Sequence, residues 1–274
     1  MPVPTVSLRP SVVALAASLL LVSACQREPA SSAAPAPDAA PTPVVTVAPA
    51  PVLDRAGLLQ AMDLAASAFG AGQEVAGASL AGRRFVVRQT FGCGGPAASA
   101  DETSVAGLAT VSWSEDRKSL KLSLTPGDWS QSALIAGDAE TWEAAEGFWL
   151  ARPWLRTDGC PAVHQSDPSV QAQPSAQTMG LAAVFKEGGS RTVRRNGRAY
   201  EFTMRGEGDQ PPVPPAQGYR LVLEGRMAAF ADGRAVRCRA SGPDQRPICI
   251  GAVQLDRVAF EDADGKMLSE WRDG

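Results

Sequence analysis

The chain has very little of the residue that enzymes use most often for proton transfer, because only one of its 274 residues, His164, is a histidine. One histidine cannot form a His-Glu-x-x-His zinc site. The sequence also has no Gly-x-Ser-x-Gly, Ser-x-x-Lys, Gly-x-Gly-x-x-Gly or Walker motif. His164 follows Cys160-Pro161 in an expected loop, where a solvated side chain is a simpler interpretation than a general base. The sequence therefore carries no catalytic signature, and we expect no cofactor.

Long apolar runs are also missing after the amino terminus, where no stretch approaches the roughly 20 residues that a transmembrane helix needs. Residues 11–22 form a shorter apolar run, preceded by Arg9 and followed by Ser23, Ala24 and Cys25. This arrangement is typical of a secretory signal peptide. The alternatives are an amino-terminal membrane anchor, or a secreted protein cut after an Ala-x-Ala-like site with Cys25 incidental.

The segment Val22-Ser23-Ala24-Cys25 resembles the cleavage site of bacterial lipoprotein precursors, with Val22 where that family more often has Leu. The resemblance covers the first 26 residues only. It implies that residues 1–24 are a signal peptide and that acylated Cys25 holds the protein to a lipid bilayer, where several acyl chains give stable anchoring. Gln26 stands where an Asp favours the inner membrane, so the family habit implies an outer-membrane anchor with the domain facing the periplasm.

Residues 25–52, the lipidated Cys and a linker, lack the apolar side chains that a core requires. Within 26–52, 15 of 27 residues are Pro or Ala, which predicts a disordered, semi-rigid spacer. Residues 53–274 then form the periplasmic domain, for which we identify no family. Without the first 24 residues the chain has 25 basic and 29 acidic residues, a formal charge of −4 that argues against nucleic acid as a partner.

Four further cysteines, Cys93, Cys160, Cys238 and Cys249, predict two disulfides in an exported chain. Cys238 and Cys249 flank a turn centred on Pro243-Asp244, which places their thiols opposite each other. Cys93 then pairs with Cys160 by elimination. A zinc site is the alternative, but the sequence has no Cys-x-x-Cys pair.

The remaining pattern predicts one helix followed by many strands. Asp54 is placed to cap a helix up to about Phe69, and Gly70 follows it. The apolar face of this helix consists of Leu58, Leu59, Met62, Ala65, Ala66 and Phe69. About ten short strands with period-two alternation then predict a mainly β fold, an antiparallel sandwich or a partly open barrel.

Four turns set the expected hairpins and their registers. A turn at Asp116-Arg117 joins 109–113 to 120–124. Turns at Asn196-Gly197, Asp232-Gly233 and Asp264-Gly265 are expected to place three further pairs of segments side by side: 191–193 with 200–202, 227–229 with 236–238, and 258–260 with the segment at Trp271. Asp262 and Asp264 faintly resemble a calcium loop, but the hairpin turn explains them without a metal.

Acidic residues gather at Asp138, Glu140, Glu143 and Glu146, and paired carboxylates can hydrolyse glycosides. A solvated acidic face is the simpler interpretation. Two other groups are candidate binding residues. Arg194, Arg195 and Arg198, with Arg191, surround the Asn196-Gly197 turn and suit an anionic partner, or else keep a hairpin tip soluble. Trp149 and Trp154, with Trp142, suit a sugar ring or a protein partner, or else belong to the core.

Taken together, these patterns predict an outer-membrane-anchored periplasmic lipoprotein whose β domain has a non-catalytic binding role or a structural role in the envelope. Its expected partners are the bilayer, through Cys25, and an anionic envelope component or a protein. The alternative is a glycosidase-like envelope hydrolase that uses carboxylates in the segment Asp138–Glu146.

Overall fold

The computed structural model describes residues 50–73, 80–99, 104–135, 142–161, 177–208 and 210–272. These residues all belong to one unit, Ala48–Gly274. Cys25, His164, Asp138 and Glu140 lie outside the described residues, and so do the signal peptide and most of the linker. Within the described ranges no helix has the length and apolar character needed to cross a membrane.

Helix α1 (Arg55–Gly70) begins at the predicted cap, where the Asp54 carboxylate accepts a hydrogen bond from the Gly57 N–H at 2.8 Å. The predicted apolar face is confirmed, because the side chains of Leu58, Leu59, Met62 and Ala65 are buried. Phe69 differs from the prediction and is 40% exposed. It belongs to the last turn, where it lines a surface hollow instead of the core.

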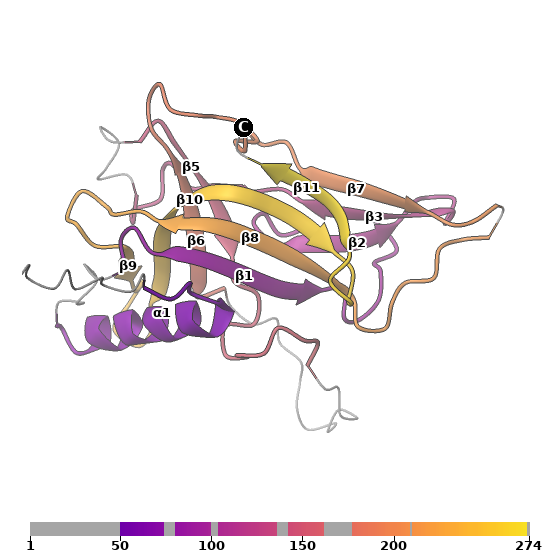
Figure 1. The fold of residues 1–274 in the computed structure, drawn as a ribbon. Helices are drawn as coiled ribbons and strands as arrows, with labels where there is room; N and C mark the ends of the chain where they lie inside the picture. Colours follow the sequence, from indigo (N-terminus) through magenta and orange to yellow (C-terminus); the bar gives the residue numbers. More distant parts are fainter. Residues whose placement is uncertain are drawn as a thin grey trace, which may run out of the picture. The chain divides into compact units, whose positions relative to one another are not determined.

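The described chain forms two sheets, shown in Figure 1. The larger has the order β1-β8-β10-β6-β5-β4, with β9 and β11 also paired to β10, and the smaller has the order β2-β3-β7. The strands are β1 (Arg84–Phe91), β2 (Ala109–Trp113), β3 (Ser119–Leu124), β4 (Gly127–Asp128), β5 (Ala144–Trp149), β6 (Met179–Phe185), β7 (Tyr200–Arg205), β8 (Tyr219–Met227), β9 (Val236–Arg239), β10 (Ile248–Glu261) and β11 (Met267–Arg272).

Strand β10 is the centre of the larger sheet because it pairs with four other strands. Its first residues pair with β9 on one side and β6 on the other, and its later residues pair with β8 and β11. The β6–β10 pair is parallel, whereas the other strand pairs described are antiparallel. The predicted mainly β fold is confirmed as two sheets packed together, with one mixed sheet where an antiparallel arrangement was expected.

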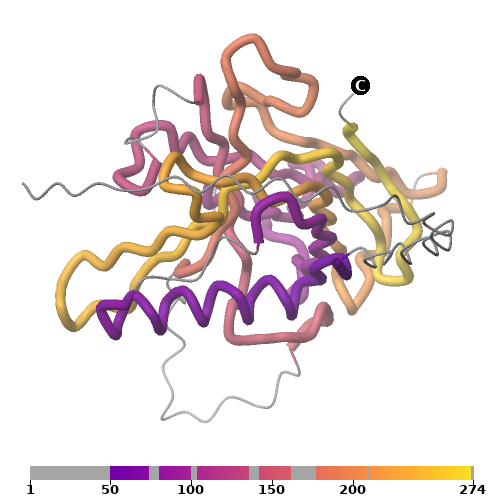
Figure 2. Tube along the Cα trace, turned by 60° about the vertical axis from the view of Figure 1, so that its left-hand side comes forward, coloured from indigo at the N-terminus to yellow at the C-terminus, as the bar shows by residue number. Residues whose placement is uncertain are grey.

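The main core lies on one face of the larger sheet, which is covered by α1 and by the three-stranded sheet. Its members come from nearly every element, including Leu59 of α1, Leu122 of β3 and Phe260 of β10. Figure 2 shows α1 running alongside the β9–β10 hairpin, which it contacts. A second, smaller cluster covers the opposite face at β5, β6 and β10: Leu134, Ile135, Trp142, Ala145, Ala182, Val184, Phe230, Ile250 and Ala252. Strands β5 and β6 are therefore covered on both faces.

Two of the predicted hairpins are confirmed in register. Val111 lies opposite Leu122 in the β2–β3 pair, as expected for a turn at Asp116-Arg117. Val258 lies opposite Trp271 in the β10–β11 pair. The Asp262 carboxylate accepts hydrogen bonds from backbone N–H groups in its own turn, so its role there is that of a turn residue.

The other two predicted hairpins are wrong: the Asn196-Gly197 turn forms, whereas the turn near Gly233 is centred one residue earlier than expected, on Ala231-Asp232. Asn196 and Gly197 have the expected positive φ values of 52° and 79°, but residues 191–199 form no strand. Tyr200 instead begins β7, which pairs with β3. At Asp232-Gly233 the flanking strands β8 and β9 do not pair, because both pair with β10: Met227 lies opposite Val253 and Cys238 opposite Cys249.

Both predicted disulfides are confirmed. Cys238 and Cys249 are directly opposite in the β9–β10 pair, with their Cα atoms 4.1 Å apart, and the turn at Pro243-Asp244 is closed by a Gln245 N–H to Gly242 carbonyl bond. Cys93 and Cys160 have Cα atoms 5.6 Å apart. The second bridge joins the end of β1 to the segment that follows β5, which lie 67 residues apart in sequence.

Candidate functional site

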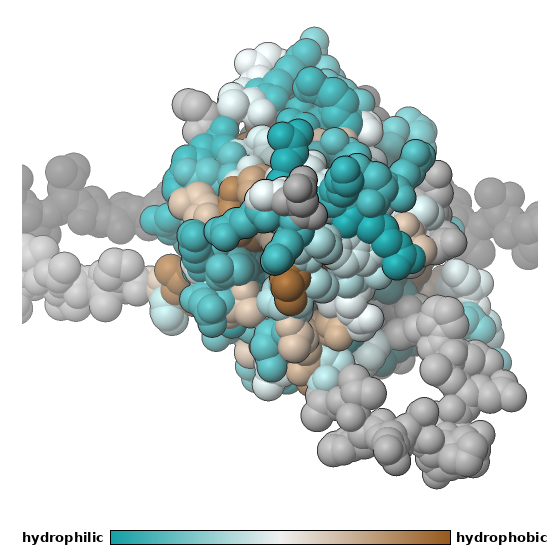
Figure 3. All heavy atoms as spheres, turned by 90° about the vertical axis from the view of Figure 1, so that its right-hand side faces the viewer, coloured by the Kyte–Doolittle hydropathy of each residue, from teal (hydrophilic) through white to brown (hydrophobic). Residues whose placement is uncertain are grey.

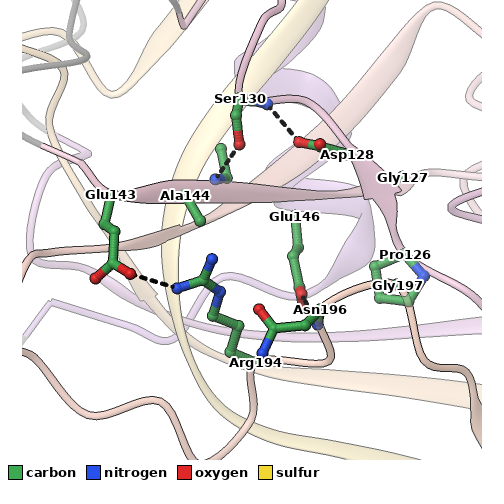
Figure 4. A pocket seen from close by; sticks show the side chains of 11 residues that line it. Pro126, Gly127, Asp128, Ser130, Glu143, Ala144, Glu146, Arg194, Asn196 and Gly197 are labelled. Carbon is green, nitrogen blue, oxygen red and sulfur yellow. Dashed lines mark hydrogen bonds and ion pairs between the residues drawn. The ribbon is translucent and has the colours of Figure 1, made fainter.

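Glu143, Glu146 and Arg194, which the sequence marked in two separate groups of candidates, lie together in the structure. They surround a cavity of about 320 Å³ between β4, β5 and the 191–197 segment, which we call the carboxylate pocket (Figure 4). Its lining consists of Pro126, Gly127, Asp128, Ser130, Glu143, Ala144, Ala145, Glu146, Arg194, Asn196 and Gly197. The question is whether any of these charged groups is free to act on a ligand.

Glu146 is held by the backbone of the neighbouring segment. Its side chain is buried on β5 and accepts hydrogen bonds from the Asn196 N–H at 2.8 Å and from the Arg195 N–H at 2.9 Å. Burial raises the pKa of Glu146, and these two backbone bonds act against that rise. Glu146 therefore holds the backbone of residues 195 and 196, the first half of the Asn196-Gly197 turn.

Asp128 lies opposite Glu146 in the β4–β5 pair. Its carboxylate accepts a hydrogen bond from the Ser130 N–H at 3.0 Å, and hydrogen bonding by Ser130 lowers the pKa of Asp128. Two carboxylates with pKa values shifted in opposite directions are a pattern of acid–base catalysis. Figure 4, however, shows the Asp128 side chain directed toward Ser130 and the Glu146 side chain directed toward Asn196.

The arginines around the Asn196-Gly197 turn were expected at an exposed hairpin tip, but most of them contact other side chains of the domain. Arg194 makes an ion pair with Glu143 at 3.0 Å, and Arg191 pairs with the same carboxylate. The guanidinium group of Arg195 lies over the Tyr200 ring, 4.7 Å from its centre. Arg198 is the one exposed residue of the three candidate arginines, and its Nε donates to the Arg195 carbonyl at 3.2 Å. Glu143 thus pairs with two of the four arginines, and the Arg195 guanidinium group donates to the Ala199 carbonyl.

The predicted tryptophan candidates are dispersed. Trp142 is buried against Phe230, with ring centres 5.3 Å apart, so it belongs to the smaller cluster. Trp154 is 57% exposed in the segment after β5. Trp149, at the end of β5, is half-buried and contacts a residue that the sequence analysis did not single out, Trp129, at 4.6 Å between ring centres and a tilt of 60°.

Trp129 lies against a floor made of glycines from three adjacent strands. A Cβ atom on Gly147 would lie 1.9 Å from the Trp129 indole, and one on Gly180 would lie 2.6 Å from it. Gly127 lies opposite Gly147 in the β4–β5 pair, and a Cβ atom on it would lie 2.8 Å from the Trp129 indole nitrogen. Any side chain at these positions would lift the indole off the sheet, because such distances are far below van der Waals contact.

The backbone of Trp149 is fixed from two directions. Its N–H donates to the Gly107 carbonyl at 2.9 Å, and its carbonyl accepts from the Gln89 amide at 3.1 Å. The Gln89 carbonyl oxygen also accepts from the Ala151 N–H at 3.0 Å, so this buried side chain bridges β1 and the end of β5. The Trp129–Trp149 pair is therefore pre-organised, which suits a binding site.

Beside the two indoles lies a cavity of about 200 Å³, which we call the tryptophan pocket. Its lining consists of Trp129, Ser132, Ala133, Leu134, Trp149, Arg239, Ser241, Ile248 and Ile250. Arg239 is exposed at the end of β9, and its guanidinium group makes no hydrogen bond or ion pair within the part of the chain that the structure describes. It is the one charged residue among the lining residues named above, so the pocket combines aromatic walls with an unpaired cation.

One other face of the molecule, the groups that could hold a metal ion and the comparisons with known proteins complete the description of the candidate sites. Figure 3 shows the face onto which the β2–β3 turn projects, which is mainly hydrophilic with small apolar patches. Among the described residues no group of three His, Cys, Asp or Glu side chains is placed to hold a metal ion. No family model matches the chain, and no curated protein or solved structure matches it.

Sequence reasoning missed Trp129 and Arg239, although a signal for Trp129 is present. Glycines inside strands often mark the close approach of another group. Gly127, Gly147 and Gly180 each lie within a strand of the larger sheet. Arg239 carries no such mark, because it is one of many arginines in the sequence and its lack of a partner depends on the folded chain.

Proposed function

We propose that this protein is a lipid-anchored lipoprotein of the outer membrane whose periplasmic domain binds an envelope component at the tryptophan pocket without changing it chemically. The observation that carries the proposal is the pre-organised Trp129–Trp149 pair beside the unpaired Arg239. Rigid aromatic side chains next to a cation provide contact area and direction at small entropic cost.

A non-catalytic role fits the polar groups of the carboxylate pocket. Glu146 is engaged by two backbone N–H groups, and Glu143 is engaged by two arginines. A general base must reach the proton that it removes, and a nucleophile needs such a base within hydrogen-bond distance. Here the same groups serve to join the 191–197 segment to β5.

The anchoring part of the proposal is tested by mass and fractionation. The mature protein is expected to begin at Cys25 and to exceed the mass of residues 25–274 by several acyl groups, because a single chain binds a membrane only marginally. C25S is expected to leave the membrane fraction. A C25S protein that is processed and still fully membrane-bound contradicts the proposal.

The binding part is tested with soluble envelope fragments and the full chain immobilised through a carboxy-terminal tag. W149A is expected to retain at least about tenfold less material than wild type, since an aromatic residue at the centre of a binding site often supplies about 2 kcal/mol. W154A is the matched control, because Trp154 is exposed and does not line the pocket. Equal retention by wild type and W149A, with both proteins folded, refutes binding at this pocket.

A glycosidase-like hydrolase is the second candidate, and it is favoured by one observation only: the opposite pKa shifts of Asp128 and Glu146 beside a cavity. Incubation of wild type and E146Q with envelope glycan would separate the two functions. Release of new reducing ends by wild type and not by E146Q would establish hydrolysis. Our proposal expects no release by either protein.

A further inference from the structure

We infer that the ligand of the tryptophan pocket is a saccharide whose pyranose ring carries a carboxylate group. This inference rests on the proposed function, because it names the ligand class of the same site. Three properties of the pocket lead to it: the arrangement of the indoles, the size of the cavity and the unpaired charge at its rim.

The indoles favour a saturated ring. Trp129 and Trp149 are tilted by 60° with their centres 4.6 Å apart, so they form two walls at an angle. Both side chains are partly exposed, so each offers some ring surface to solvent. The electron-rich face of an indole attracts the weakly positive C–H groups of a pyranose ring, in the same way that it attracts the edge of an aromatic ring. Leu134, Ile248 and Ile250 add apolar contact at the sides.

The size of the cavity favours one ring over an extended chain. Its volume of about 200 Å³ is below the roughly 300 Å³ at which pockets for drug-sized molecules begin. One six-membered ring fits such a space, with its substituents at the mouth. A peptide would need a longer groove to place several side chains, so the dimensions disfavour a peptide ligand.

The charge at the rim favours an acidic ligand. Arg239 lies opposite Ile248 in the β9–β10 pair and has no partner within the described residues. A guanidinium group can bind a carboxylate with two parallel hydrogen bonds. Ser241 also lines the pocket, and its hydroxyl can bond to a sugar hydroxyl. A neutral sugar would leave the Arg239 guanidinium group without an anionic partner. A simple carboxylate would have no ring to contact the two indoles.

The test uses the full chain with C25S, which leaves every residue of the domain unchanged, and three defined probes. N-acetylmuramic acid has a pyranose ring and a carboxylate, N-acetylglucosamine has the ring alone, and lactate has the carboxylate alone. Binding is followed by tryptophan fluorescence and by NMR of the indole N–H signals. We expect N-acetylmuramic acid to bind up to about fivefold more tightly than N-acetylglucosamine, as one exposed ion pair allows, and lactate to leave the indole signals unchanged.

Two variants and a control assign the contacts. R239Q is expected to reduce the affinity for N-acetylmuramic acid to that of N-acetylglucosamine, with no effect on the neutral sugar. Because Arg239 is exposed, this variant is expected to fold normally, so the test does not depend on W149A. W149A is expected to weaken both sugars at least about tenfold, whereas W154A leaves both unchanged. Equal affinity for the two sugars, or no effect of R239Q, overturns the inference.

The outcomes separate this inference from the proposed function. If envelope fragments are retained in a Trp149-dependent manner while none of the three probes binds, the saccharide assignment is wrong and the binding function stands. If W149A retains fragments as well as wild type does, the binding function itself is wrong. A short acidic peptide that displaces N-acetylmuramic acid at lower concentration would assign the pocket to a protein ligand and overturn the saccharide assignment.

Discussion

The two faces of strand β5 differ in whether the charged side chains near them have partners. On one face, Glu146 and the nearby Glu143 are joined to the 191–197 segment by hydrogen bonds and ion pairs. On the other, Gly147 and Trp149 contact Trp129, and Arg239 at the rim of that pocket has no partner in the described chain. The charged groups of a dense cluster can thus pair with one another and with backbone groups and have a structural role. One isolated cation beside aromatic rings, by contrast, remains free for a ligand.

The largest effect is expected from adding a methyl group at the glycine floor. In G147A the new Cβ would lie 1.9 Å from the Trp129 indole, so the ring must leave the sheet. We expect the free energy of unfolding to fall by about 3 kcal/mol, measured by urea denaturation, because overpacking costs this much in rigid cores. G94A is the matched control, since nothing lies within 4 Å of its added Cβ. Similar stability of G147A and G94A would mean that Trp129 does not rest on Gly147.

Removal of the Glu146 carboxylate should have the next largest effect. E146A leaves the partly buried N–H groups of Arg195 and Asn196 without their acceptor, and we expect a loss of about 2 kcal/mol in the free energy of unfolding. E146Q is the control, because one amide oxygen can accept both bonds. If E146A and E146Q are equally stable, these two bonds do not hold the backbone of residues 195 and 196.

A smaller difference in stability is expected between variants of Arg194, beside the carboxylate pocket, and Arg239, beside the tryptophan pocket. Arg194 is 17% exposed and pairs with Glu143, so R194Q is expected to cost about 1 kcal/mol. R239Q is expected to change stability by less than about 0.5 kcal/mol, because no described interaction is lost. Thermal unfolding of both variants gives the comparison. A larger loss for R239Q would show that its guanidinium group already has a structural partner.

The smallest effect is a pH dependence that belongs to Glu146. Burial raises its pKa above the ordinary value of 4.5, so the folded state favours the protonated form. The stability that this group contributes is therefore complete below about pH 4.5 and is lost as pH rises through its folded-state pKa. We expect the stability of wild type relative to E146Q, measured by urea denaturation, to decline as the pH rises above about 4.5. Parallel curves for the two proteins would contradict the raised pKa.

The sequence predicts those parts of the fold in which partners are close along the chain. The β2–β3 and β10–β11 hairpins and the Cys238–Cys249 bridge follow from local turns, and each is confirmed. The Asn196-Gly197 turn also forms, and a turn precedes Gly233, but neither joins the expected pair of strands: residues 191–199 form no strand, β7 pairs with β3, and β8 and β9 both pair with β10. Pairing with β3 and β10 brings more burial than a local hairpin, and a turn motif carries no information about such distant partners.

The candidate site is predicted less well, because it depends on which charges find partners. Trp149 was identified from its neighbours in sequence, whereas Trp129 and Arg239 reach the pocket only through the pairing of β4 with β5 and β9 with β10. Arg194 and Arg195 were noted as a cationic cluster, and their partners Glu143, Glu146 and Tyr200 belong to other elements. Sequence spacing shows where charges gather but not which of them are neutralised.

The position of β10 in the chain has a consequence for assembly. Before residues 248–261 are present, β1 can pair with β8, and β5 can pair with β4 and β6, but no other described strand joins these two half-sheets. A chain that emerges amino terminus first from a ribosome or a translocation channel must therefore expose the apolar faces of both halves until residues 248–261 appear. Completion of the sheet is a late and strongly non-local event, and a chaperone that shields apolar strands would have its greatest effect on this chain during that interval.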